Sequence, residues 1–355
     1  MTTRTDGELR APGRGLTRVP GTAGDLAGVR LIDLAWNDLT ELPSWLGGLR
    51  SLEELRLDGN RLGAVPDLTG LTALRALHLD GNRLTEVPAC PPGLRTLFLY
   101  GNAVTGLPPD RLGPAAAGLR HLSLGGNRLT DVPDTLWELT GLESLNLAEN
   151  RLTEVPSAVG RLTALRMLDL AHNRLTVIPP ELGDLGLTDY LYLGDNAFTE
   201  VPEALAKLDR LSYLGLDANR LTRLPASLGA MAALTELRLS GNRLAELPRS
   251  LGGLARLREL HLRGNRLTAL PPELTRLGEL RHLDLRDNLL AELPAGMAGL
   301  TRLAHLDLRN NRLRELPADL ADLPALAKLD LRWNKLDGDP EPLRRLRERG
   351  CAVLM

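Results

Sequence analysis

The most chemically versatile residues of the chain are histidines that stand two positions from a carboxylate. Three successive segments contain such pairs: Glu259-Leu-His261, His282-Leu-Asp284 and His305-Leu-Asp307. Imidazole and carboxylate groups bind transition metals, and imidazole titrates near neutral pH. No HExxH pattern or compact ligand spacing accompanies them, and a His beside an Asp on a sheet is usually a hydrogen-bonded pair. We therefore predict no metal and no cofactor, and keep a metal- or pH-responsive site on this cluster as the alternative hypothesis.

A second set of chemically active residues consists of arginines at equivalent positions, spaced 23 residues apart. They are Arg263, Arg286, Arg309 and Arg332. In three of these segments an aspartate stands two residues earlier, at Asp284, Asp307 and Asp330. Two interpretations stay open: a self-neutralising surface ladder of Arg–Asp pairs, or a docking site for an acidic or phosphorylated segment of a partner.

Aromatic residues make up only 3% of the chain, so their positions are informative. All four tyrosines and all six histidines lie six, four, two or one residues before a recurring asparagine. Phe98 and Tyr100 define one patch, and Tyr190, Tyr192 and Tyr213 define a second. Aromatic, His and Arg side chains are typical of binding hot spots, although tyrosines also simply suit an exposed pleated surface. We predict that both patches and the arginines Arg263, Arg286, Arg309 and Arg332 contact a partner.

Sequence motifs of enzymes are missing from the chain. There is no G-x-x-x-x-G-K-[ST] phosphate-binding loop and no G-x-S-x-G nucleophile elbow. We therefore predict no catalytic residue and no enzymatic activity.

The positions of all these residues are set by a repeat centred on asparagine. From Asn127 onward every step between successive asparagines is 23 residues, and a proline follows six residues after each asparagine. The recurring asparagines are Asn37, Asn60, Asn82, Asn102, Asn127, Asn150, Asn173, Asn196, Asn219, Asn242, Asn265, Asn288, Asn311 and Asn334. Self-similarity of this kind over most of the chain predicts one elongated array of repeats.

The segment LESLNLAEN, which ends at Asn150, indicates what each repeat does. Leu145 and Leu147 point inward and Asn146 between them points outward, as in a half-buried strand. Beyond the strand the backbone turns and leaves N–H and C=O groups without strand partners, each costing about 1 to 3 kcal/mol if buried unpaired. An asparagine amide both donates and accepts, so Asn150 is predicted to satisfy several of these groups, including groups in the next coil. We therefore interpret the recurring asparagines as a structural ladder.

After the asparagine, a Leu-Pro step ends the strand side, and apolar residues at three-residue spacing predict a short helical or 3-10 turn. The complete pattern L-x-x-L-x-L-x-x-N-x-L-x-x-L-P-x-x-L-x-x-L resembles the leucine-rich repeat family, in its intracellular 23-residue Leu-Pro form. The resemblance implies an α/β solenoid, a right-handed horseshoe with a concave parallel β-sheet and short helical or 3-10 segments on the convex side. It also implies a non-enzymatic scaffold or adaptor in signal transduction, because some members bind small GTPases or phosphatases.

The domain organisation follows from where the pattern degenerates. We predict a disordered N-terminus at residues 1–6, a degenerate capping repeat at 7–28, the repeat array at 29–340 and a C-terminal cap at 341–355. Arg14 stands where the first asparagine is expected, and residues 341–350 form an amphipathic pattern typical of a capping helix. The step from Asn82 to Asn102 shortens to 20 residues and the next lengthens to 25, so a local distortion is predicted near residues 88–118.

Composition bounds the partners and the compartment. With 43 basic and 45 acidic residues the net charge is -2, which offers no general field for nucleic acid. The N-terminus lacks an apolar signal segment, Cys90 and Cys351 show no metal-ligand spacing, and no run reaches the roughly 18 apolar residues of a membrane helix. We predict a cytoplasmic protein that binds a protein partner on its concave face, with no nucleic-acid binding and no membrane insertion. Self-association as a structural module is a further alternative.

Overall fold

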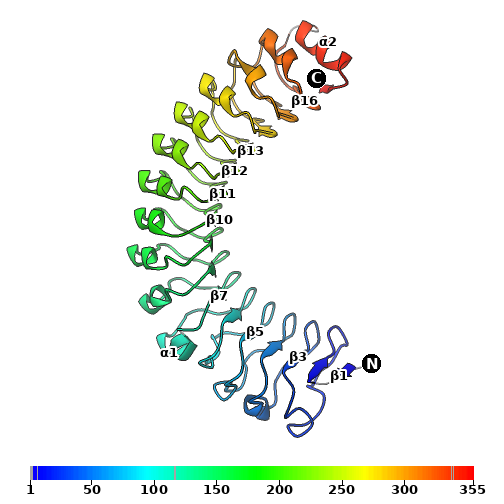
Figure 1. The fold of residues 1–355 in the computed structure, drawn as a ribbon, viewed down its shortest axis with the longest axis vertical. Helices are drawn as coiled ribbons and strands as arrows, with labels where there is room; N and C mark the ends of the chain where they lie inside the picture. Colours follow the sequence, from blue (N-terminus) through cyan, green and yellow to red (C-terminus); the bar gives the residue numbers. More distant parts are fainter. Residues whose placement is uncertain (1–2, 6, 116, 337, 339) are drawn as a thin grey trace. The chain divides into compact units, whose positions relative to one another are not determined.

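The computed structural model of the chain describes residues 3–5, 7–115, 117–336, 338 and 340–355. The chain forms two compact units, of which the first comprises Met1–Glu154 and Arg161–Asn173 and the second Val155–Gly160 and Arg174–Met355. Both units are stacks of coils, in each of which a short strand is followed by a turn and a return segment (Figure 1). No helix in the described part of the chain has the length and apolar character needed to cross a bilayer.

The strands of the first unit pair in chain order. Strands β2 to β9 run parallel and in register, so that Leu122 pairs with Leu145 on the next strand. Their bounds are β2 (Glu8–Arg10), β3 (Leu31–Asp33), β4 (Glu54–Arg56), β5 (Ala76–His78), β6 (Thr96–Phe98), β7 (His121–Ser123), β8 (Ser144–Asn146) and β9 (Met167–Asp169). Strand β1 (Thr3–Thr5) pairs antiparallel with β2. Residues 1, 2 and 6 of the predicted N-terminal segment lie outside the described residues.

The strands of the second unit are arranged in the same way. They are β10 (Tyr190–Tyr192), β11 (Tyr213–Gly215), β12 (Glu236–Arg238), β13 (Glu259–His261), β14 (His282–Asp284), β15 (His305–Asp307), β16 (Lys328–Asp330) and β17 (Ala352–Leu354). Each pairs parallel with the next, so that Leu260 pairs with Leu283. A parallel arrangement results because every coil returns to the same side before its strand begins.

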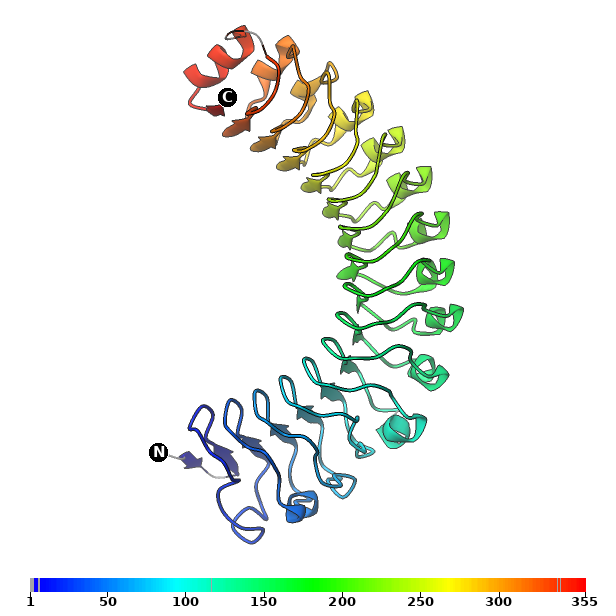
Figure 2. The same ribbon diagram turned by 180° about the vertical axis from the view of Figure 1, so that it is seen from behind.

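The return segments carry mostly 3-10 turns on the side opposite the strands (Figure 2). In the first unit these are η1 (Ser44–Gly48), α1 (Pro109–Leu112), η2 (Gly113–Ala115) and η3 (Asp134–Glu138), and η4 (Ser157–Arg161) lies where the two units meet along the chain. In the second unit they are η5 (Pro180–Asp184), η6 (Glu203–Lys207), η7 (Ala226–Ala230), η8 (Arg249–Gly253), η9 (Pro272–Arg276), η10 (Met297–Gly299), η11 (Ala318–Asp322) and the helix α2 (Glu341–Glu348). In η6 the carbonyl of Pro202 accepts the N–H of Leu205 at 3.1 Å, which explains why the turn starts directly after the proline. The predicted solenoid of parallel strands and 3-10 turns is confirmed for each unit.

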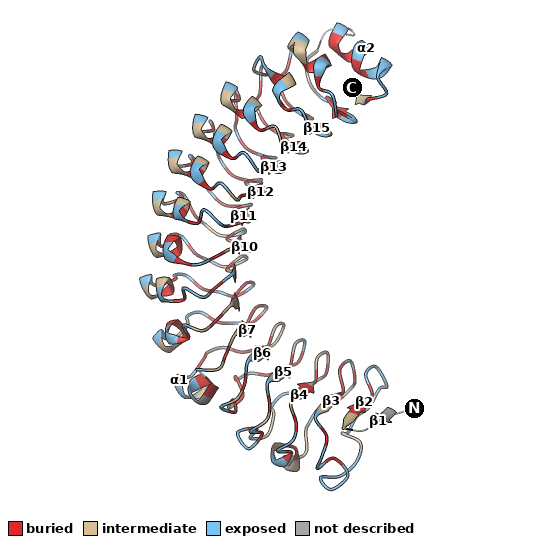
Figure 3. Ribbon diagram, viewed as in Figure 1, coloured by how far each residue is buried: buried red, intermediate tan, exposed pale blue. Residues whose placement is uncertain are grey.

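Leucine fills the interior of the coils. The central residue of each strand from β2 to β16 is buried, and so are leucines of the turns such as Leu205 and Leu251. Figure 3 shows the buried residues lining the inside of the coils, whereas the exposed ones cover the loops and the outer faces of the turns. Phe198 and Trp137 are the largest fully buried side chains of the described residues.

The asparagine ladder is confirmed. The amide nitrogen of Asn150 donates to the carbonyls of Leu124, Leu147 and Ala148 at 2.9 to 3.2 Å, and its oxygen accepts the N–H of Leu129 at 2.9 Å. Leu124 and Leu129 belong to the preceding coil rather than to the next coil that we expected. The amide therefore ties each turn to the coil before it, because the carbonyl of Leu124 and the N–H of Leu129 point toward the following coil and meet Asn150 there.

The predicted distortion near residues 88–118 affects the return segments and leaves the strands in register. Strand β6 pairs with both neighbours, and Thr96 stands opposite Ala76 and His121. The extra residues of the longer coil form α1 and η2, which lie away from the strands (Figure 1). Length variation is absorbed there because the outer segments do not share a hydrogen-bond ladder.

Both predicted caps continue the stack. At the N-terminal side the N–H of Arg14 donates to the side-chain oxygen of Asn37 at 2.8 Å, so Arg14 occupies the asparagine position without an amide of its own. At the C-terminal side α2 replaces the last 3-10 turn and buries Leu343 and Leu346, and β17 pairs with β16 as the final strand.

Candidate binding surface

The outward-facing strand residues of each unit form a continuous surface. In β10 the central Leu191 is buried, whereas Tyr190 and Tyr192 on either side are partly exposed. Parallel pairing stacks equivalent positions about 4.8 Å apart, so outward side chains contact their counterparts in neighbouring coils. The surface therefore consists of rows, and its chemistry depends on which residues share a row.

On the first unit, the predicted patch around Phe98 is joined by a histidine. His78 pairs with Phe98 across β5 and β6, and the two rings meet edge to face with centroids 5.2 Å apart. Burial lowers the pKa of His78, and the nearby acids Asp58 and Glu54 only partly offset this effect. The ring of His78 is therefore neutral at pH 7 and packs as an apolar neighbour of Phe98.

Tyr100 is engaged within the first unit. Its hydroxyl donates to the carboxylate of Glu149 at 2.7 Å, which raises the pKa of Tyr100 to about 12. The side chain crosses the intervening coil over Gly125 and Gly126, where an added Cβ would lie 2.8 Å and 3.3 Å from the tyrosine ring. The two glycines thus make room for a bridge between coils, and Tyr100 must leave Glu149 before its hydroxyl can donate a hydrogen bond to a partner.

On the second unit the three predicted tyrosines come together as a cluster. The rings of Tyr190 and Tyr192 have centroids 4.6 Å apart, and those of Tyr192 and Tyr213 are 4.7 Å apart in an edge-to-face arrangement. Gly215 lies beneath them, since a Cβ there would meet the Tyr213 ring at 3.1 Å and the Tyr192 ring at 3.2 Å. The guanidinium of Arg238 lies 5.8 Å from the centroid of Tyr213, and burial raises the pKa of that tyrosine.

A hollow of about 450 Å³ lies next to this tyrosine cluster. It forms at Ala218, Gly241 and Gly264, which precede three successive ladder asparagines and carry no side chain beyond Cβ. Its polar wall is made by Asp217, Arg238, Ser240, His261, Arg263 and Arg286.

We did not predict this hollow or the role of Arg238. Small residues at the same position of three consecutive repeats were not a sufficient signal, because Gly59, Gly81, Gly101 and Gly126 hold that position in the first unit. The position has a positive φ at these glycines and at larger residues such as Glu149, so the turn by itself favours glycine there.

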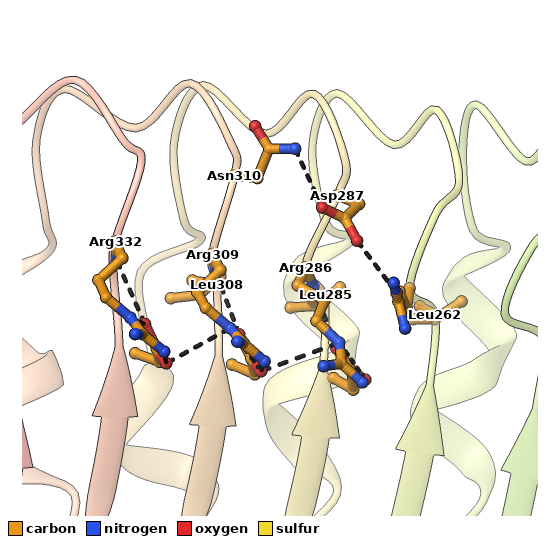
Figure 4. Close-up of polar contacts among 12 residues, drawn as sticks. Leu262, Leu285, Arg286, Asp287, Leu308, Arg309, Asn310 and Arg332 are labelled. Carbon is orange, nitrogen blue, oxygen red and sulfur yellow. Dashed lines mark hydrogen bonds and ion pairs between the residues drawn. The ribbon is translucent and has the colours of Figure 1, made fainter. Parts of the chain in front are cut away.

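The arginine column is a network of internal ion pairs (Figure 4). Arg286 bonds to Asp284 at 2.9 Å, Arg309 to Asp307 at 2.6 Å, and Arg332 to Asp330 at 2.7 Å. Diagonal contacts join the pairs, because Arg309 also lies 3.3 Å from Asp330. Hydrogen bonding to Asp307 is the main reason that the pKa of Arg309 is raised. Arg263 differs, since its partner is Asp287 in the next turn, at 3.0 Å.

These contacts correspond to the self-neutralising ladder rather than to a row of unpaired cations. Asp330 is only 2% exposed, and its burial raises its pKa, but the hydrogen bonds from Arg332 more than offset this and leave the pKa below its usual value. Exposure of the arginine side chains is 54% for Arg263, 31% for Arg286, 24% for Arg309 and 40% for Arg332. Arg263 is therefore the most accessible member of the column.

The histidines and acids of β13 and β14 form a further cluster. The rings of His261 and His282 stack with centroids 5.2 Å apart, and His305 meets His282 edge to face at 5.9 Å. Nε2 of His261 lies 3.1 Å from Glu259, as expected for a hydrogen-bonded pair. Burial is the largest cause of a lowered pKa at His282.

Comparisons with known proteins agree with this architecture. Models of the leucine-rich repeat region match residues 158–269, and models of the leucine rich repeat match residues 92–152, 117–175 and 278–336. A comparison with curated protein sequences found no match.

Solved structures give closer counterparts. A leucine-rich repeat protein of Leptospira interrogans is 31% identical, with a TM-score of 0.90 over 98% of this chain and 95% of that one. The Arabidopsis receptor kinase HAESA, solved in complex with the peptide hormone IDA, is 29% identical with a TM-score of 0.75, over 98% of this chain and 61% of its own. Drosophila Toll in its complex with Spatzle is 26% identical with a TM-score of 0.79, over 94% of this chain and 48% of its own. The asparagine ladder and the likeness to the Leptospira protein over nearly the full length of both chains lead to one conclusion: the chain belongs to the leucine-rich repeat family.

Proposed function

We propose that this protein is a non-enzymatic scaffold that binds a protein partner through the strand face of its second unit. One observation carries the proposal: Tyr190, Tyr192 and Tyr213 form a cluster of touching rings beside a hollow of about 450 Å³. Aromatic and arginine side chains that cluster next to a concavity are typical anchors of protein interfaces.

The tyrosine cluster is suited to anchoring a partner protein because its side chains are already restrained. Each ring already contacts its neighbour, so little conformational freedom is left to lose when a partner covers it. A tyrosine also combines an apolar ring with a hydroxyl that can bond at the edge of an interface. A partner segment that places an apolar side chain on Tyr192 and a polar or acidic group near Arg238 would use both parts of the surface.

The arginine column is expected to contribute less to partner binding than four unpaired arginines would. An acidic partner must displace the carboxylates that Arg286, Arg309 and Arg332 already bind, and the aspartates left behind would lose their counter-charges. Arg263 is the exception, because it is half exposed and lines the hollow. Within the column, Arg263 is the contact that we expect to matter most.

The known complexes of similar proteins support a protein ligand without identifying it. HAESA was solved with a peptide hormone and Toll with Spatzle, so two neighbours of this fold bind peptide or protein ligands. A small GTPase or another signalling protein stays a prediction that comes from the family resemblance. The cytoplasmic location stays a prediction as well.

Affinity capture tests the proposal. The purified chain and a variant with alanine at Tyr190, Tyr192 and Tyr213 are incubated with extract of the source cells, and bound proteins are compared by quantitative mass spectrometry. Loss of a hot-spot side chain costs about 2 kcal/mol or more, so the partner's affinity should fall at least about 30-fold.

A matched control uses the equivalent positions of the first unit. The variant with alanine at Ser144, Asn146 and Met167 changes the same three strand positions away from the tyrosine cluster. Both variants should show the circular dichroism of the unchanged chain. A partner lost from both variants, or from neither, would contradict a binding surface at the tyrosines, and recovery of the chain itself as the main partner would indicate self-association instead.

A further inference from the structure

Strands β13 and β14 place four potential metal ligands next to one another. Pairing between the strands sets Glu259 opposite His282 and His261 opposite Asp284. All four lie on the outward face, since each flanks the buried central leucine of its strand. Imidazole and carboxylate groups therefore alternate in both directions across two neighbouring strands.

Three of these residues converge. One ligand atom each from His261, His282 and Asp284 lie within 4.8 Å of one another. Asp284 is 4% exposed and the two histidines are partly buried, so the convergence is held by packing as well as by the backbone. His261 and Asp284 also line the hollow, which gives an ion a path from solvent.

We propose that His261, His282 and Asp284 form a binding site for a divalent transition metal of the zinc class. Two imidazoles and one carboxylate make a ligand set that zinc accepts while keeping a fourth position for water or another ligand. Zinc–ligand bonds of about 2.0 to 2.2 Å bring ligand atoms within about 3.5 Å of one another, so the side chains must close by about 1 Å. Rotation of partly exposed histidine side chains supplies a movement of this size, and the fourth position faces the hollow.

Two neighbouring groups bear on the site. Arg286 bonds to Asp284 at 2.9 Å and competes with a cation for that carboxylate. Asp307 lies 3.9 Å from Arg286 and can take over the guanidinium when an ion binds. Nε2 of His261 lies 3.1 Å from Glu259, so zinc would bind His261 through Nδ1 while Glu259 holds the ring from its other side.

A second group of possible ligands shares one residue with this site. Glu236, Glu259 and His261 also bring ligand atoms within 4.8 Å of one another. This set has one imidazole and two carboxylates, and Arg238 bonds to Glu236 at 2.6 Å. Each set contains one carboxylate that is paired with an arginine, so the second imidazole decides, and we favour the site with His282 because imidazole suits zinc.

Zinc binding to the full chain tests the proposal. The tag-free protein is stripped of metal, titrated with Zn²⁺ by isothermal calorimetry and analysed for bound zinc after dialysis. We expect one ion per chain. Loss of a supporting residue alone costs about 10- to 100-fold in metal affinity, so His261→Ala, His282→Ala and Asp284→Asn should each weaken binding by at least about tenfold.

Control variants separate this site from its alternatives. His121→Ala changes a histidine at the position equivalent to His282 in the first unit and should leave zinc binding unchanged. Arg286→Ala removes the competing cation and should tighten binding. Cobalt added in place of zinc should give the absorption of a low-coordinate site, and the His282→Ala variant should lose it.

Several results would overturn the proposal. These are the lack of a saturable zinc site, full binding by His282→Ala, or loss of binding in Glu236→Gln together with full binding in Asp284→Asn. Circular dichroism shows whether each variant is folded, and a misfolded variant is replaced by His282→Gln, which must show the same loss. The tyrosine cluster takes no part in the site, so the metal site and the protein-binding surface stand or fall separately.

Discussion

Asp80 of the first unit and Asp330 of the second show opposite behaviour, although both lie on the outward strand face or just beyond it. In the first unit the carboxylate of Asp58 accepts the N–H of Asp80 at 3.0 Å, and that of Asp80 accepts the N–H of Tyr100 at 2.7 Å. Burial, together with the charge of Asp58, raises the pKa of Asp80 to about 6. In the second unit the bonds from Arg332 outweigh burial and hold the pKa of Asp330 below its usual value.

The difference comes from the groups that each carboxylate contacts. Two residues after Asp330 the chain has an arginine, whereas the neighbours of Asp58 and Asp80 along their row are each other and Tyr100. Burial and the charge of a neighbouring carboxylate both raise the pKa of an aspartate. A neighbouring arginine lowers it. Protonation therefore stabilises the fold around Asp80, whereas ionisation stabilises it around Asp330.

The largest effect is expected from breaking the neutralised network. Arg309→Ala removes the guanidinium that lies 2.6 Å from Asp307 and 3.3 Å from Asp330, and leaves the buried Asp330 with only Arg332. Removing one partner of a buried pair is costly, so we expect the second unit to lose roughly 2 to 3 kcal/mol of stability at pH 7. Hydrogen exchange of β15 and β16 measures the loss. As a control, Arg302→Ala breaks an exposed pair with Glu279 and should cost less than about 0.5 kcal/mol; equal losses in the two variants would remove the distinction between buried and exposed pairs.

A smaller effect is expected from Asp80 and from pH. Because the pKa of Asp80 in the folded chain, about 6, exceeds its ordinary value of 3.8, protonation favours the folded state. The stabilisation by protonated Asp80 is complete below about pH 3.8 and is lost as the pH rises through about 6. Hydrogen exchange of β5 and β6, corrected for the intrinsic rate, should therefore slow as the pH falls from 7 to 5.

Asp80→Asn should abolish that response and stabilise the first unit at pH 7. Discounted for the partial exposure of the carboxyl group, the gain is on the order of 1 kcal/mol. The depressed pKa of Asp330 has the opposite sign, because its stabilisation is present above pH 3.8 and lost as the pH falls through the lower folded-state value. The same response to pH 5 in the strands next to Asp80 and in those next to Asp330 would refute the contrast between the two carboxylates.

The smallest effect is expected from the bridge made by Tyr100. Tyr100→Phe removes the bond to Glu149 but keeps the ring over Gly125 and the N–H that binds Asp80. An exposed hydrogen bond of this kind contributes about 0.5 kcal/mol, and the variant should leave the pH response of Asp80 unchanged. Urea denaturation at pH 5 and pH 7 measures both quantities. A changed pH response would show that the hydroxyl, rather than the backbone, controls Asp80.

The repeat pattern alone determined most of the fold. A period of 23 residues with inward leucines sets which residues face outward, and the asparagine at each turn requires the ladder that is observed around Asn150. The same phase places Tyr190, Tyr192 and Tyr213 on one surface. Position was predictable because the backbone of every coil is tied to its neighbours by the same bonds.

Only the tertiary structure decided what the outward side chains do. Arginine has several rotamers that reach different acids, so the sequence left open whether Arg309 pairs with Asp307 or awaits a partner. Tyr100 reaches Glu149, which lies two coils away. The hollow is found where Gly241 and Gly264 carry no side chain. Periodicity specifies the direction of each Cα–Cβ bond, whereas the far ends of long side chains are placed by the neighbours that they meet across the sheet.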